Sequence, residues 1–195
     1  MNNPLESLPK TLGLGFALLV LIILLLGMDT FFAPGSERWW KFFFRWLHLL
    51  SGIMWIGLLW YFNFVQIPSM PKIPDEQKPA IGKVIAPTAL WWFRWGAMAT
   101  IVTGLILAHL SGYLGTLALG LGSENISAIG IGMWLGIIMW FNVWFVIWPN
   151  QKRALGIVEA SDDAKKASAR TAMLFSRTNT LLSIPMLYAM VSGHL

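Results

Sequence analysis

Residues 12–27, LGLGFALLVLIILLLG, indicate the fold class of this chain, because they form an apolar run without a charged residue. A helix of about 20 apolar residues is long enough to cross the hydrocarbon core of a bilayer. With its continuation to Phe32 the run is too long for a simple signal peptide, and no small-residue cleavage site follows it. The run therefore predicts a transmembrane helix.

Four further segments share this apolar character, so the chain is predicted to cross the membrane about five times. Of its 195 residues, 56% are hydrophobic and 12% are charged, whereas soluble domains carry about 25% charged residues. The sequence predicts an all-α integral membrane protein, with residues 1–195 as a single transmembrane helical domain in a lipid bilayer. The predicted spans are residues 12–32, 42–66, 90–114, 126–148 and 171–194.

The connector at residues 67–89 differs from the spans because it contains five prolines. Proline punctuates regular structure, so we expect an irregular loop here. The prolines are Pro68, Pro71, Pro74, Pro79 and Pro87.

The basic residues predict the orientation of the chain. If the N-terminus is cytoplasmic, the inner connectors hold nine Lys and Arg residues and the outer connectors hold two, Arg38 and Lys41. The positive-inside rule therefore favours a cytoplasmic N-terminus and a periplasmic C-terminus. Topology alone accounts for these basic residues, so no nucleic-acid partner is needed to explain them.

All three histidines are predicted to lie in the outer leaflet. His48 follows Lys41 by seven residues, which places it roughly 10 Å inside the outer end of the second span. His109 precedes Leu114 by five residues, roughly 8 Å from the outer end of the third span. His194 ends the fifth span on the same side. Ionisable residues within spans are functional candidates by default.

Two histidines from different helices at one depth are typical of a b-type haem site. We expect His48 and His109 to be the iron ligands, with His194 as the substitute ligand. A lone histidine in a membrane is also often only a hydrogen-bond partner between helices. The chain has no cysteine, which excludes thiolate metal sites, iron–sulfur clusters and covalent c-type haem. The residues expected around the haem on the second span are Arg45, which would pair with a propionate, Gly52, which leaves room for the macrocycle, and Trp55.

A second polar layer is predicted near the inner ends of the spans. Such a layer is suited to a quinone headgroup or an anionic ligand. The alternative is a hydrogen-bonded network between helices, with arginines that extend to the interface. Its members are Asn63, Gln66, Arg94, Asn142, Arg177 and Asn179.

Several separated motifs resemble the bacterial urate hydroxylase, or urate oxidase N-terminal, membrane-domain family. They cover roughly residues 40–195 and read RWLHLLSGIMWIG from Arg45, YFNFVQ from Tyr61, WFRWG from Trp92, FNVWFVIWPNQK from Phe141 and RTNTLLSIPM from Arg177, followed by His194. The resemblance implies a membrane-embedded redox protein. In this family a cytochrome c domain often follows the membrane part, so this cysteine-free chain resembles a form lacking that domain.

The sequence leaves three functions open. The first is a b-type haem protein of the bacterial inner membrane that exchanges electrons with a periplasmic cytochrome c or another membrane redox subunit. The second, which rests on the resemblance, is a urate hydroxylase-like oxidoreductase. The third is a haem-free structural or assembly subunit of a membrane complex. A homo-oligomer is compatible with each of them.

Overall fold

The computed structural model describes residues 3–27, 33–115 and 127–192. The chain divides into two units, Met1–Phe43 and Phe44–Leu195, and helix α2 (Glu37–Trp60) begins in the first and continues in the second. The first unit also contains the short 3₁₀ helix η1 (Pro4–Glu6) and helix α1 (Leu8–Leu26). Helix α1 buries no residue within the protein, as expected of a helix whose whole surface contacts lipid.

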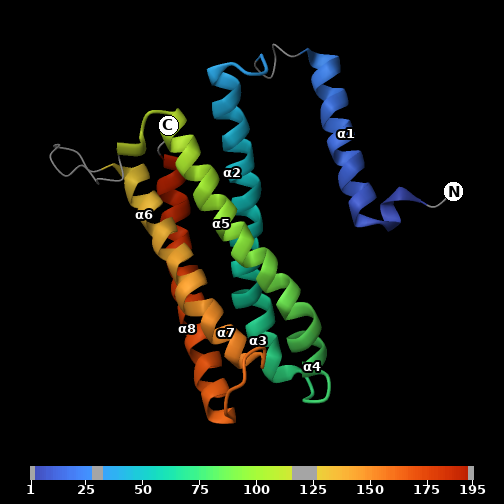
Figure 1. The fold of residues 1–195 in the computed structure, drawn as a ribbon, viewed down its shortest axis with the longest axis vertical. Helices are drawn as coiled ribbons and strands as arrows, with labels where there is room; N and C mark the ends of the chain where they lie inside the picture. Colours follow the sequence, from blue (N-terminus) through green and yellow to red (C-terminus); the bar gives the residue numbers. More distant parts are fainter. Residues whose placement is uncertain (1–2, 28–32, 116–126, 193–195) are drawn as a thin grey trace. The chain divides into compact units, whose positions relative to one another are not determined.

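The second unit is a bundle of four long helical segments (Figure 1). Because α2 and α5 run in opposite directions, as do α6 and α8, the ends of different helices meet at the same end of the bundle (Figure 1). Beyond α2 its elements are η3 (Tyr61–Gln66), α3 (Ile67–Ser69), η4 (Met70–Lys72), α4 (Lys78–Ala80), η5 (Ile81–Ile85), α5 (Ala86–Leu110), α6 (Ala128–Phe141), η7 (Asn142–Ile147), α7 (Trp148–Ala154) and α8 (Asp162–Ser192).

The expectation of an irregular loop at residues 67–89 is wrong, because most of this segment is helical. Pro79 lies in the first turn of the helix that begins at Lys78, where the missing N–H would have no partner within the helix in any case. Pro68 and Pro87 lie inside the continuous helical stretches Glu37–Lys72 and Lys78–Leu110, each shortly after a π-helical segment, and local π adjustments of this kind allow a membrane helix to contain proline. Only residues 73–77 interrupt the helices, so the two spans on either side extend toward each other.

The prediction of a helical membrane protein is confirmed. Four helical stretches of the described chain are long and apolar enough to cross a bilayer: Leu8–Leu26, Glu37–Lys72, Lys78–Leu110 and Ala128–Ala154. Helix α8 has 31 residues, which is also long enough to span, but it is more polar than the other four. Part of this polarity is buried within the bundle, on a row made of Ser168, Ala172, Ser176, Asn179 and Ser183.

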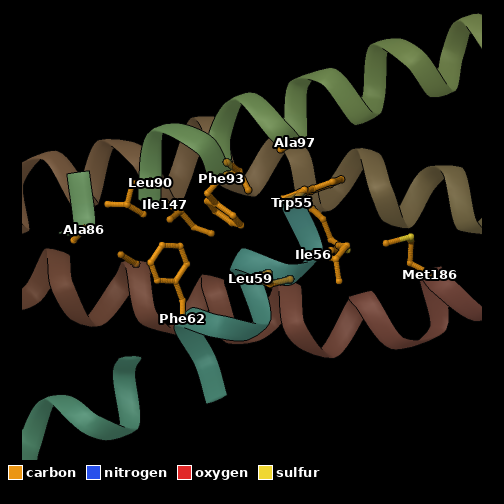
Figure 2. Packing of buried hydrophobic residues seen from close by; sticks show 13 residues of the cluster. Trp55, Ile56, Leu59, Phe62, Ala86, Leu90, Phe93, Ala97, Ile147 and Met186 are labelled. Atoms are coloured by element: carbon orange, nitrogen blue, oxygen red, sulfur yellow. The ribbon is translucent and has the colours of Figure 1, made fainter. Parts of the chain in front are cut away.

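Large apolar side chains fill the centre of the bundle (Figure 2). Trp55 and Leu59 of α2 are almost completely buried, and the ring of Phe62 meets that of Phe93 edge-on at 5.7 Å between centroids. Glycines bring the backbones close together between these side chains. A Cβ on Gly96 of α5 would lie 3.3 Å from the backbone nitrogen of Trp55, so α2 and α5 approach closely there.

Helices α6 and α8 make a similar close contact, which gives a matched test. A Cβ on Gly132 would lie 3.2 Å from Cβ of Ala189 and 3.3 Å from the backbone nitrogen of Met190, whereas one on Gly136 would meet nothing within 4 Å. Replacing either glycine by alanine raises the intrinsic helix propensity by the same amount. We expect Gly132→Ala to be less stable than Gly136→Ala by about 1–3 kcal/mol, because only the first overpacks the interface.

Thermal unfolding of the two variants and the wild type, followed by circular dichroism in one detergent, measures this difference. Equal melting temperatures for the two variants would contradict the close contact between α6 and α8.

Candidate functional site

The imidazole of His48 on α2 contacts α5. Its Nδ1 lies 2.9 Å from the backbone oxygen of Thr100 and 3.4 Å from Oγ1 of Thr103. A carbonyl oxygen can only accept a hydrogen bond, so Nδ1 carries the proton and donates a hydrogen bond to the carbonyl oxygen of Thr100. In the neutral ring this leaves the lone pair on Nε2, for which no protein partner is recorded among the described residues.

Gly104 makes this position of the His48 ring possible. A Cβ at residue 104 would lie only 2.8 Å from Cε1 of His48 and 3.0 Å from its Nδ1. Gly52, one turn after His48 on α2, faces open space, since a Cβ there would meet nothing within 4 Å. The two glycines therefore have different roles: Gly104 accommodates the ring, and Gly52 leaves space beside it.

The structure does not bring His109 onto the face of α5 that contacts His48. His109 is exposed and lies five residues after Gly104, which is about 140° around the helix. No hydrogen bond or ion pair is recorded for the side chain of His109 in the described parts of the chain. The substitute ligand His194 lies outside the described residues.

The other residues predicted around His48 have different environments. Arg45 is exposed, and its charge acts on Tyr113, which follows the end of α5. Burial raises the pKa of Tyr113, and the positive charge of Arg45 partly opposes this rise. Trp55 is only 1% exposed and belongs to the apolar core, and its Nε1 has no recorded partner. Trp55 is thus primarily a packing residue.

The tight contact at Gly104 predicts a selective effect of an added methyl group. We expect Gly104→Ala to push the His48 ring away from the Thr100 carbonyl and to unfold at a lower temperature than Gly52→Ala. The difference should be about 1–3 kcal/mol, the usual cost of overpacking.

Thermal unfolding in detergent compares the two variants, with Gly52→Ala as the matched glycine on an open surface. A Gly104→Ala protein that is as stable as the Gly52→Ala protein would contradict the described position of His48.

The predicted polar layer is partly a hydrogen-bonded network near the middle of the bundle. Asn179 of α8 is 0% exposed; it accepts a bond of 2.9 Å from Nδ2 of Asn142 and donates one of 2.9 Å to the backbone oxygen of Met139. Asn63 donates to Oγ of Ser176 at 2.8 Å. Arg177 is exposed and is not part of this network. For Asn142 and Asn179 the network interpretation is therefore sufficient.

Next to this network lies a cavity of about 180 Å³, which we call the polar cavity. Most of its wall is apolar, but Gln66, Gln151 and Ser176 contribute polar groups. The side-chain oxygens of Gln66 and Gln151 are buried and accept no hydrogen bond from the described residues, and neither does Oδ1 of the neighbouring Asn63. The apolar lining consists of Phe62, Ile67, Ala86, Leu90, Phe93, Ala154, Leu155, Ala169, Ala172 and Met173.

Arg94 is a buried cation one turn beyond the cavity wall. It is 8% exposed, its Cζ lies 3.3 Å from the centre of the Trp148 ring, and its Nη1 is buried without a hydrogen-bond partner in the part of the chain that the structure describes. Lys152 lies on the same ring at 5.7 Å. The ion pairs of the described residues join Lys41 to Glu37, Lys78 to Asp75 and Lys165 to Asp162, so Arg94 has no carboxylate partner among them.

Two polar residues of the cavity wall, Gln151 and Ser176, were not among the site residues predicted from the sequence. Gln151 lies next to the last residue of the motif FNVWFVIWPNQK. Ser176 lies on the buried row of α8, whose three- and four-residue spacing is visible in the sequence. Three π-helical segments were also not predicted: η3 contains the wall residues Phe62 and Gln66, η5 directly precedes the wall residue Ala86, and η7 contains Asn142 of the hydrogen-bonded network. Such segments occur frequently at functional sites.

Comparison with known families identifies part of the chain. The sequence profile described as urate oxidase N-terminal matches residues 116–195, which include α6, η7, α7 and α8. This match over part of the chain supports the family that the motifs predict, and it contains the motifs that begin at Phe141 and Arg177. No curated protein and no solved structure matches the chain at a significant level.

Proposed function

From the premise that this chain belongs through residues 116–195 to the urate oxidase N-terminal family, we propose that it is a membrane redox protein. In this proposal His48 holds a b-type haem, and the protein exchanges electrons with a cytochrome c or another membrane redox subunit of the bacterial inner membrane. The observation that carries the proposal is the hydrogen bond of 2.9 Å between His48 Nδ1 and the Thr100 carbonyl.

This hydrogen bond is what a ligating histidine needs. Metal-bound histidines usually donate their other ring N–H to a carbonyl or carboxylate, which fixes the tautomer and the ring orientation. Thr100 provides the carbonyl, and Gly104 allows the ring to lie against α5. His48 would therefore present Nε2 to iron, and the bound haem would supply one-electron transfer.

The fit of the remaining predicted residues is uneven. Gly52 borders open space beside His48, and Arg45 precedes His48 by one turn, where it would pair with a propionate. His109 lies on another face of α5. The proposal accordingly assigns one ligand, His48, to the described part of the chain. His194 remains the proposed substitute for His109 as the second ligand.

Haem content tests this assignment. We expect purified wild-type protein to show the reduced spectrum of a b-type haem, and His48→Ala to lose most of its haem. His109→Ala is the matched control and should retain the haem, because that side chain faces away from His48. A pyridine haemochrome assay, normalised to protein, gives the stoichiometry.

Either of two results would overturn the proposal. The first is equal haem content in His48→Ala and the wild type. The second is a folded wild-type protein without colour, which would favour a structural or assembly subunit.

A urate-oxidising enzyme is the second candidate, supported by the family match and by the polar cavity. It predicts that membranes containing the protein consume urate and reduce added cytochrome c. It also predicts that Gln151→Leu, which alters the cavity wall, lowers this activity. Membranes that leave urate unchanged with every electron acceptor supplied would count against this function.

A further inference from the structure

We propose that the junction of α5 with η7 and α7 binds the headgroup of an anionic phospholipid of the phosphatidylglycerol class. We call this junction the arginine seam and define it by Arg94 and Trp95 of α5, Trp144 of η7, and Trp148 and Lys152 of α7. None of these five residues lines the polar cavity, and none contacts His48, so the proposal depends neither on haem nor on a substrate. It rests on buried donors without acceptors, on charge, and on the level of the seam in the membrane.

Aromatic contacts hold the two cations of the arginine seam where the helices meet. Cζ of Arg94 lies 3.3 Å from the centre of the Trp148 ring, and Nζ of Lys152 lies 5.7 Å from the same centre. One turn before Trp148, the ring of Trp144 meets that of Trp95 edge-on at 5.5 Å between centroids. A single tryptophan ring therefore brings together two positive charges, one from each helix.

The polar groups of the arginine seam can only donate hydrogen bonds. Nη1 of Arg94 and Nε1 of Trp144 are buried, and neither has an acceptor in the described part of the chain. Arginine, lysine and tryptophan side chains contain no acceptor, so these groups cannot satisfy one another. An unpaired buried charge is costly. The complementary ligand accepts hydrogen bonds and carries negative charge, which is the chemistry of a phosphodiester.

The arginine seam lies at one boundary of the apolar part of the bundle. Between Arg94 and His109, α5 contains no ionisable residue, and none lies between Ala128 and Lys152. Because α5 and α6 run in opposite directions, Arg94 and Lys152 are the charges that end these two apolar stretches on the same side (Figure 1). This is the level at which a helix leaves the hydrocarbon core and meets the headgroups.

Exposed tryptophans beside the arginine seam mark the same level. Trp91 and Trp92 are 47% and 49% exposed, and the ring of Trp91 lies 6.3 Å from that of Trp95 between centroids. Tryptophan is enriched at the membrane–water interface. Arg94 keeps 8% of its surface exposed and Lys152 is half-buried, so both cations remain accessible to a headgroup whose acyl chains lie against the tryptophans.

The two cations select among the sources of a phosphate group. Phosphatidylglycerol and phosphatidylcholine share the phosphodiester, but choline adds a positive charge that Arg94 and Lys152 repel. Inorganic phosphate has the negative charge but no acyl chains to contact Trp91 and Trp95. The site therefore favours phosphatidylglycerol over both.

Native mass spectrometry of the purified full chain in detergent tests the proposal. The probes are phosphatidylglycerol, phosphatidylcholine with the same acyl chains, and inorganic phosphate as a competitor. We expect one molecule of phosphatidylglycerol to bind about ten- to thirtyfold more tightly than phosphatidylcholine, as expected for two basic residues. Inorganic phosphate at the same concentration should not displace it.

Variants then assign the contributions. Arg94→Gln should weaken phosphatidylglycerol binding by about ten- to a hundredfold, because it removes hydrogen bonds to a charged group. Lys152→Gln should weaken it by about fivefold, the effect of one basic residue near a headgroup. Arg153→Gln is the matched control, since it removes the same charge from the neighbouring exposed position of α7, and it should bind phosphatidylglycerol like the wild type.

Three results would overturn the proposal. The first is equal binding of phosphatidylglycerol and phosphatidylcholine by the folded wild type. The second is displacement of the lipid by inorganic phosphate at the same concentration, which means a site for a free anion. The third is an equal loss in Arg153→Gln and Arg94→Gln, which means general attraction to a basic surface. If Arg94→Gln does not fold, the comparison of Lys152→Gln with Arg153→Gln and the probes on the wild type still decide.

Discussion

Helices in lipid gain no hydrophobic free energy by contacting each other, and the rest of this bundle depends on that constraint. Its interfaces are accordingly formed by close backbone approach and by hydrogen bonds between helices. Gly96 allows α5 to approach the backbone of Trp55, and Gly132 allows α6 to approach α8. The bonded pair Asn142 and Asn179 connects η7 with α8. These contacts align the helices and so determine which polar groups remain without a partner.

The remaining polar groups are the functional candidates, because an unsatisfied buried group is costly in a membrane protein. His48 is half-buried, its ring is oriented by the Thr100 carbonyl, and its Nε2 has no recorded partner among the described residues. The buried groups without a recorded partner in the described chain include Nη1 of Arg94 and the side-chain oxygens of Asn63, Gln66 and Gln151 around the polar cavity.

The sequence predicted the helices better than it predicted the sites. Apolar length is a direct signal, so the segments that form the long helices were identified, although the helix that contains the third predicted span begins at Lys78 and not at residue 90. The prolines at 67–89 were misinterpreted because proline is compatible with the start of a helix, as at Pro79, and with a membrane helix that adjusts locally to a π-helical form, as near Pro68. The depth of His48 and His109 followed from topology, but the angle between them depends on how α5 is rotated in the bundle. Gln151 and Ser176 were missed because helices far apart in sequence create the cavity.

The central claim is that His48 binds iron through Nε2, and pulsed electron paramagnetic resonance of the ferric protein tests it most directly. In protein labelled with ¹⁵N only at histidine, the account predicts a strong hyperfine coupling from a histidine nitrogen to iron. This coupling should be unchanged in His109→Gln, whereas in His48→Gln the contribution of the His48 nitrogen should be lost. A wild-type protein without such coupling, or a His48→Gln protein that keeps all of it, would contradict the account.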